Sequence, residues 1–222
     1  MLAFHFIFWT LGARNALTAT ASLIVNMAPL VMPFFLWFAL REKVYRIQWI
    51  GTLTAFSGVV LLVSPRLVFR SGSMVGEAYC LLAMVLFALY LTLGRLNRRM
   101  TSLWLYLVPV YMWASLISLI VAFLQNPSLT APAPIEWLWL FLLAILPTVV
   151  GHGLINYCLR HLRGQTVAVA NQGQFIFAMP MAAFFFHEIP SFVFYPAAAI
   201  VLGGCWLATR QGPKVEEQGL IP

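Results

Sequence analysis

Long apolar runs separated by short polar gaps are the feature that most restricts how this chain can fold. A helix needs about 20 mainly apolar residues to cross a bilayer, and seven runs come close to that length while the first is shorter. The runs are 2–12, 17–40, 47–63, 76–93, 103–124, 135–159, 166–186 and 192–209. No gap is long enough for a soluble domain. We therefore expect an all-α integral membrane protein, a polytopic bundle of about eight helices.

Composition supports this reading and excludes several others. Hydrophobic residues make up 62% of the chain and charged residues only 9%, with a mean hydropathy of +0.90, whereas about a quarter of the residues in soluble domains are charged. The six acidic residues are all glutamates, namely Glu42, Glu77, Glu136, Glu188, Glu216 and Glu217. A water-soluble fold and any chemistry that depends on aspartate are therefore excluded.

The basic residues lie in the gaps and are unevenly distributed between alternate gaps. If every run crosses the bilayer, ten Lys and Arg fall on one side and three on the other, which accounts for all 13. The ten are Arg41, Lys43, Arg46, Arg95, Arg98, Arg99, Arg160, Arg163, Arg210 and Lys214, and the three are Arg14, Arg66 and Arg70. Cytoplasmic gaps carry the excess of positive charge, so the C-terminus is predicted to be cytoplasmic. Nucleic-acid binders instead cluster these residues on one solvated face, so no nucleic-acid partner is predicted.

No set of residues has the spacing of a catalytic or metal site. The three cysteines, Cys80, Cys158 and Cys205, fall inside apolar runs without metal-ligand spacing and are interpreted as small core residues. An intramembrane enzyme would need a nucleophile with its base, a metal cluster or paired carboxylates. Neither catalysis nor a metal nor a cofactor is therefore predicted.

The first run differs from the others because it has about half the length needed to cross. No basic segment typical of a signal peptide precedes it. We interpret it as the later part of a helix in a chain with an incomplete N-terminal region.

The chain contains a weak internal repeat with an offset of 146 residues. Sliding the sequence by this amount pairs Arg14 with Arg160, Glu42 with Glu188 and Gly58 with Gly204 without a gap. A repeat unit of five helices would place the second copy in the opposite orientation, because five is odd. The gap at 41–46 carries three basic residues and its counterpart at 187–192 carries none, which agrees with inversion. Inverted repeats are common in secondary transporters.

These residues resemble the EamA-type permeases of the drug/metabolite transporter superfamily. The first copy has Pro29 within a helix, Glu42 at its end, then Gly51 and Gly58, and the second has Pro180, Glu188, Gly203 and Gly204. The prolines are expected to interrupt their helices, and the glycines are expected to allow close helix packing. The resemblance implies two inverted five-helix repeats in a bacterial inner (plasma) membrane. Residues 1–63 would be the C-terminal part of the first repeat and 76–209 the second, and 210–222 are expected to form a disordered cytoplasmic tail.

Polar side chains inside the apolar runs are the candidate substrate-binding residues, because such groups are costly in a bilayer. They are His152, Asn156, Asn171, Gln172, Gln174, Asn26 and His5. We expect His152 and Asn156, one helical turn apart, to face Asn171 and Gln172 across a cavity near the middle of the membrane. The alternative is that these groups only form interhelical hydrogen bonds. Glu42 and Glu188, beside Arg41 and His187, are expected to form gating or anchoring pairs.

The predicted function is secondary transport of small metabolites or drugs, amino-acid-like or amphipathic, across the inner membrane by alternating access. No Lys or Arg lies in the middle of a run, which disfavours phosphorylated substrates. The expected partners are a small-molecule substrate and the lipid bilayer, and the oligomeric state is left open. The alternative is a non-transporting helical membrane subunit or a truncated fragment.

Overall fold

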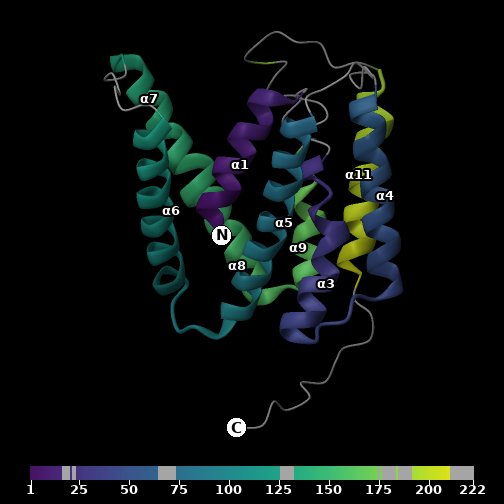
Figure 1. Cartoon of the computed structure of the whole chain (residues 1–222). Helices are drawn as coiled ribbons and strands as arrows, with labels where there is room; N and C mark the ends of the chain where they lie inside the picture. The colour runs from purple at the N-terminus through teal and green to yellow at the C-terminus, as the bar shows by residue number, and fades with distance from the viewer. Residues whose placement is uncertain are drawn as a thin grey trace.

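The computed structural model describes residues 1–16, 21, 24–64, 74–125, 133–174, 176, 184 and 192–210. Over these residues the chain is helical and contains no strand, which confirms the all-α fold class (Figure 1). The helices are α1 (Leu2–Asn15), α3 (Ala28–Leu40), α4 (Arg46–Val63), α5 (Met74–Leu96), α6 (Leu103–Gln125), α7 (Pro134–Leu143), α8 (Gly153–His161), α9 (Gly164–Asn171) and α11 (Phe194–Thr209). A π-helical segment, Ala144–His152, joins α7 to α8. The predicted tail after residue 210 lies outside the described residues. So do Pro180 and Glu188.

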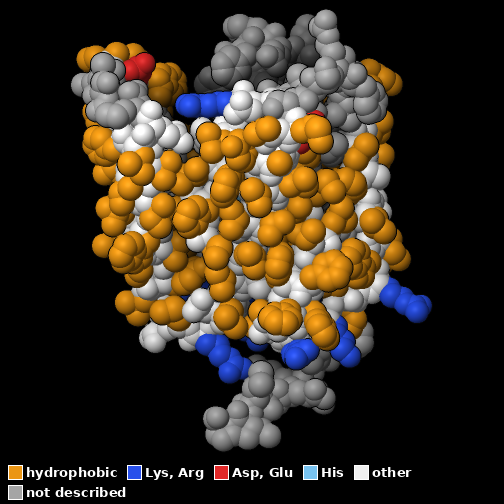
Figure 2. Space-filling model, viewed as in Figure 1, with side chains coloured by type: hydrophobic (Ala, Val, Ile, Leu, Met, Phe, Trp, Pro, Cys, Tyr) orange, Lys and Arg blue, Asp and Glu red, His pale blue; other side chains and the backbone are white. Residues whose placement is uncertain are grey.

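Three described stretches are long and apolar enough to cross a membrane, and they are Met74–Arg99, Leu103–Gln125 and Pro134–His161. The apolar helices Ala28–Leu40 and Phe194–Thr209 are shorter. Figure 2 shows hydrophobic side chains over most of the height of the molecule, with Lys and Arg at both ends and most of them at the lower end. We call this lower end, which holds the turns at 41–45, 97–101 and 161–163, the basic end.

The run predicted as one helix over 17–40 is broken at Asn26 and Met27. There the Met27 N–H donates to the Ile24 carbonyl at 3.0 Å and the Leu30 N–H to the Met27 carbonyl at 2.8 Å, so the turn is tighter than an α-helical one. Pro29 stands two residues after Met27 and has no N–H to continue the α-helical pattern. The proline expected to interrupt this helix thus lies just after the break.

The run predicted over 166–186 has a similar break at Gln172 and Gly173. The Gln172 N–H donates to the Val169 carbonyl at 3.0 Å and the Gly173 N–H to the Ala170 carbonyl at 2.9 Å. Glycine is a poor residue for continuing a helix. In both predicted helices, the polar residues near the middle therefore lie where the α-helical hydrogen-bond pattern is interrupted.

The run predicted over 135–159 is helical throughout, but around Pro147 it changes from α-helical to π-helical. Proline cannot donate to the carbonyl four residues earlier, which is that of Leu143. The Thr148 hydroxyl donates to that carbonyl at 3.3 Å instead. The π-helical segment spans this point, and such segments occur often at functional sites.

Small residues bring α4 and α11 into close contact, as the glycine pattern predicted. A Cβ at Gly51 would lie 2.7 Å from the Gly204 carbonyl oxygen, and one at Gly58 would lie 2.9 Å from the Ala197 carbonyl oxygen. The fully buried Ala55 lies between these contacts. Such close approach lets helices associate in lipid through dispersion contacts. The sequence assigned the same role to Gly203, but that glycine has no atom within reach of a Cβ.

Candidate functional site

A cluster of rings lies where α1, α5 and the π-helical segment meet. His5 of α1 is buried, and its Nδ1 lies 2.9 Å from the Ala83 carbonyl oxygen of α5. Its ring also stacks on Phe87 with 4.9 Å between ring centroids. A hydrogen bond to a carbonyl needs a proton on Nδ1, so this contact fixes the tautomer of His5.

His152 ends the π-helical segment and lies among three other rings. Ring centroids are 5.5 Å away at Phe6, 5.5 Å at Tyr90 and 6.3 Å at Phe87, all in edge arrangements. Its Nδ1 is buried and has no hydrogen-bond partner in the described part of the chain. Buried nitrogens are normally paired, so this atom can accept or donate a bond to a bound compound.

Asn156, one turn further along, is 1% exposed. Its Nδ2 donates to the Tyr90 hydroxyl at 2.5 Å and to the His152 carbonyl at 2.8 Å. Its Oδ1 is buried without a partner among the described residues. We call His5, Phe87, Tyr90, His152 and Asn156 the ring cluster.

A second polar group connects the two helix breaks. The Gln172 Nε2 donates to the Asn26 carbonyl at 3.0 Å, and the Gln174 Nε2 donates to the Asn26 Oδ1 at 3.1 Å. The tight turn at Asn26 withdraws its carbonyl from the α-helical pattern, so a side-chain donor replaces the missing N–H. The Gln172 Oε1 is buried without a partner in the described residues. Asn26, Gln172 and Gln174 form what we call the amide group.

Gln165 belongs beside this group, although sequence reasoning did not select it. Its Nε2 donates at 2.8 Å to the Pro29 carbonyl and at 2.8 Å to the Thr52 hydroxyl. Pro33 stands four residues after Pro29 and cannot donate to that carbonyl, so Gln165 supplies the bond. A glutamine at the end of the polar gap 160–165 gave no signal of this role.

The seven predicted residues therefore lie in different surroundings. His5, His152 and Asn156 come together in the ring cluster, where their neighbours are Phe87 and Tyr90 of α5. Asn26, Gln172 and Gln174 form the amide group, and Asn171 is half-buried at the end of α9. Tyr90 and Phe87 were missed because aromatic residues in an apolar run resemble ordinary lipid-facing or core residues.

The basic end is held together by a buried ion pair. Arg95 Nε lies 3.0 Å from Glu42 Oε2, with side chains 10% and 14% exposed. Arg95 also donates to the Leu159 carbonyl at 2.9 Å, and the Gly164 N–H donates to Glu42 Oε1 at 3.2 Å. The pair thus links the turn after α3 with α5, α8 and the start of α9.

The expected pairing of Glu42 with Arg41 is wrong. Arg41 ends α3 in the left-handed conformation, at φ 55°, and its guanidinium lies 4.8 Å from the centre of the Trp37 ring. Glu42 is thereby turned towards Arg95. A second basic residue, Arg163, closes the same end by donating to the Tyr45 hydroxyl at 3.2 Å and to the Lys43 carbonyl at 3.3 Å.

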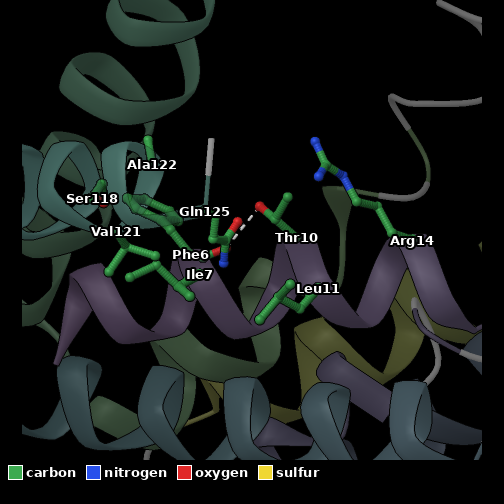
Figure 3. A pocket seen from close by; sticks show the side chains of 9 residues that line it. All are labelled: Phe6, Ile7, Thr10, Leu11, Arg14, Ser118, Val121, Ala122 and Gln125. Atoms are coloured by element: carbon green, nitrogen blue, oxygen red, sulfur yellow. Dashed lines mark hydrogen bonds between the residues drawn. The ribbon is translucent and has the colours of Figure 1, made fainter. Parts of the chain in front are cut away.

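A pocket of about 290 Å³ lies between α1 and α6, towards the end opposite the basic end (Figures 1 and 3). Its lining residues are Phe6, Ile7, Thr10, Leu11, Arg14, Ser118, Val121, Ala122 and Gln125. Phe6 lines the pocket and also contacts His152 in the ring cluster. The Phe6 side chain therefore contacts both the pocket and the ring cluster.

Comparison with solved structures finds chains with the same fold. Ten solved chains match, and one, a protein of known crystal structure, has a TM-score of 0.81 and 21% sequence identity. The alignment covers 94% of this chain and 74% of the other. A search of curated proteins found no match.

A sequence profile of one family matches nearly the whole chain, in two segments, 1–64 and 74–210. The profile is described as the EamA-like transporter family. The match covers the ring cluster, the amide group, the ion pair at the basic end and the pocket. This chain is a multi-pass membrane protein that belongs to the EamA-like transporter family.

Proposed function

We propose that the chain is a secondary transporter of small metabolites or drugs that works by alternating access. The observation that carries the proposal is the difference between the two ends of the bundle. The Glu42–Arg95 pair and Arg163 tie the basic end together, whereas the opposite end has a pocket beside the ring cluster. A transporter needs two such ends that open in turn.

The α4–α11 contact supports an organisation as inverted repeats. Under the offset of 146, Gly51 corresponds to Ala197 and Gly58 to Gly204. The contact of Gly51 with Gly204 and that of Gly58 with Ala197 are therefore each other's counterparts. Interfaces related by a two-fold axis pair residues in this reciprocal way. In Figure 1, α4 and α11 also run in opposite directions.

The amide group supports the same organisation. Asn26 and Gln172 are counterparts under the offset, and the hydrogen bond between them joins residues 146 positions apart. Both residues also lie at a helix break. A residue that contacts its own counterpart is expected on a two-fold axis. Broken helices near such an axis are a recurrent feature of transporter substrate sites.

The binding residues proposed are those selected from the sequence, with Tyr90 and Phe87 added. The unpaired Nδ1 of His152, Oδ1 of Asn156 and Oε1 of Gln172 are available to a substrate. The ring cluster and the amide group consist of rings and amides and contain no carboxylate, which suits an amino-acid-like or amphipathic compound. No step of the cycle requires a cofactor or covalent chemistry.

The orientation is proposed from the charges, with the basic end in the cytoplasm. A reporter fused after Gln211 is expected to be active on the cytoplasmic side, and one inserted near Ser128 on the opposite side. Paired fusions to alkaline phosphatase and to green fluorescent protein measure this. The reverse pattern would refute both the orientation and the inverted arrangement.

Transport is tested by replacing Asn156. Asn156→Ala removes the bond to Tyr90 and the free Oδ1 together, so we expect flux to fall at least tenfold while the protein still reaches the membrane. The measurement is efflux of amino acids and amphipathic dyes from whole cells that express the chain. Asn97→Ala is the matched control and should leave flux unchanged, because the Asn97 side chain donates to the Leu93 carbonyl one turn earlier in the chain and belongs to neither the ring cluster nor the amide group. If the native chain moves none of these compounds, a non-transporting subunit becomes the better account.

A further inference from the structure

We infer that the pocket between α1 and α6 is the outer binding vestibule of the transporter and that it selects small amphipathic anions. The inference rests on the proposed function, because it names the substrate class of that same route. It derives from the chemistry of the pocket lining, from the charge at its rim and from the position of Phe6.

The polar part of the lining consists of hydrogen-bond donors and holds no carboxylate. Arg14 brings a guanidinium, Gln125 an amide and Ser118 a hydroxyl. The Thr10 hydroxyl donates to the Phe6 carbonyl at 2.8 Å, so its own proton is already used. Figure 3 shows Arg14 extending on the same side of α1 as Thr10, with Gln125 between the helices. A carboxylate, sulfonate or phosphate oxygen is the group that such donors bind best.

Arg14 is distinctive among the described basic residues. The other described Lys and Arg lie at the basic end, where Arg95 and Arg163 have protein partners. Arg14 forms no ion pair with a described residue. A guanidinium beside low-dielectric walls attracts anions more strongly than one in open water.

The rest of the lining is apolar and determines what kind of apolar group the anion can carry. Ile7, Leu11, Val121 and Ala122 face the space of about 290 Å³. Sites for small molecules begin at about 300 Å³ and combine apolar walls with few polar groups. A single ring or a short aliphatic chain bearing one anionic group therefore fits, and a larger polycyclic compound does not.

Phe6 lies between the pocket and His152 of the ring cluster. Its ring lines the pocket and lies 5.5 Å, centroid to centroid, from the ring of His152. A compound bound with its anionic group at Arg14 would place its apolar body against Phe6. Rotation of this one side chain would bring that body to the ring cluster.

The test uses a matched pair of probes, 4-phenylbutyrate and its neutral amide 4-phenylbutyramide. Binding to the full chain in phosphatidylcholine nanodiscs is measured by calorimetry. We expect the carboxylate to bind at least tenfold more tightly than the amide. Arg14→Gln should remove this difference, and Ser118→Phe, which fills the pocket, should weaken both probes. Arg210→Gln, an equal loss of charge at the basic end, should leave both affinities unchanged.

Two results would overturn the inference. One is equal binding of the two probes to the native chain, and the other is an equal effect of Arg14→Gln and Arg210→Gln. If Arg14→Gln does not fold, Ser118→Phe decides in its place, since unchanged binding there excludes the pocket.

A lipid headgroup carries the same anionic chemistry, so the titrations are repeated in nanodiscs that contain phosphatidylglycerol. If phosphatidylglycerol weakens probe binding to the native chain but not to Arg14→Gln, a lipid is the natural occupant and the vestibule role is overturned. Unchanged probe binding supports a soluble anion. Transport is measured separately. Flux without charge-selective binding at Arg14 refutes only the vestibule. Charge-selective binding without flux leaves an anion site at the pocket but refutes the proposed transport and, with it, the role as a vestibule.

Discussion

Replacing Gly204 by leucine is expected to prevent the folded protein from accumulating in the membrane. A Cβ at this position would collide with the backbone of Ala55 on α4, and backbone cannot move aside as the end of a side chain can. Overpacking a tight contact costs about 1–3 kcal/mol and more where no rearrangement is possible. The α4–α11 contact is also the place where the proposed repeats meet, so its loss would separate them.

The adjacent glycine gives an unusually close control. Gly203 has no atom within reach of a Cβ, so Gly203→Leu should leave the thermal unfolding temperature in detergent and the yield nearly unchanged. Both variants add the same side chain to the same helix and differ only in the direction it takes. Equal yields of the two variants would show that α4 and α11 do not pack as described.

Replacing Glu42 by leucine is expected to open the basic end. The change leaves the largely buried Arg95 guanidinium without its anion, and breaking a buried pair in this way costs about 3–5 kcal/mol. The Gly164 N–H loses its acceptor at the same time. The links from the turn after α3 to α5 and α9 are thereby removed together.

Reaction of the native cysteine Cys158 with a membrane-impermeant maleimide measures this opening. Cys158 is half-buried in α8, next to Leu159, whose carbonyl accepts a bond from Arg95. In inside-out vesicles we expect its labelling, resolved by mass spectrometry, to be at least tenfold faster in Glu42→Leu. Glu136→Leu changes an exposed glutamate that caps α7 and should have no effect. Equal labelling in the native chain and in Glu42→Leu would contradict a gating role for the pair.

The ends of a helix could be predicted from the sequence where the length and hydrophobicity of an apolar run are enough to set them. The run predicted at 103–124 forms α6 with nearly the same ends, because length and hydrophobicity suffice there. The predicted close packing of Gly51 and Gly58 was confirmed. The breaks at Asn26 and Gln172 were harder, because an apolar run contains no sign of where its hydrogen bonds become irregular.

The candidate site could be predicted only in part, because its partners come from distant segments. Polar residues in apolar runs identified His5, His152 and Asn156, but their neighbours Phe87 and Tyr90 look like any aromatic residue of a membrane helix. Glu42 was assigned to its sequence neighbour, whereas its partner Arg95 is 53 positions away. Such pairings depend on the way the helices pack, which local patterns do not contain.

The π-helical segment Ala144–His152 determines how the two halves of its helix are rotated relative to each other. Each residue of an α-helix turns the chain by about 100°, and a widened turn changes the phase of everything that follows. No residue of α7 is buried, whereas α8, which follows the segment, buries Asn156 and Leu159 on one side. Insertion or loss of a single residue between Ala144 and His152 would rotate Asn156 away from Tyr90 without altering any residue of the ring cluster. The length of this segment therefore decides, as much as the identity of any side chain, which groups meet in the ring cluster.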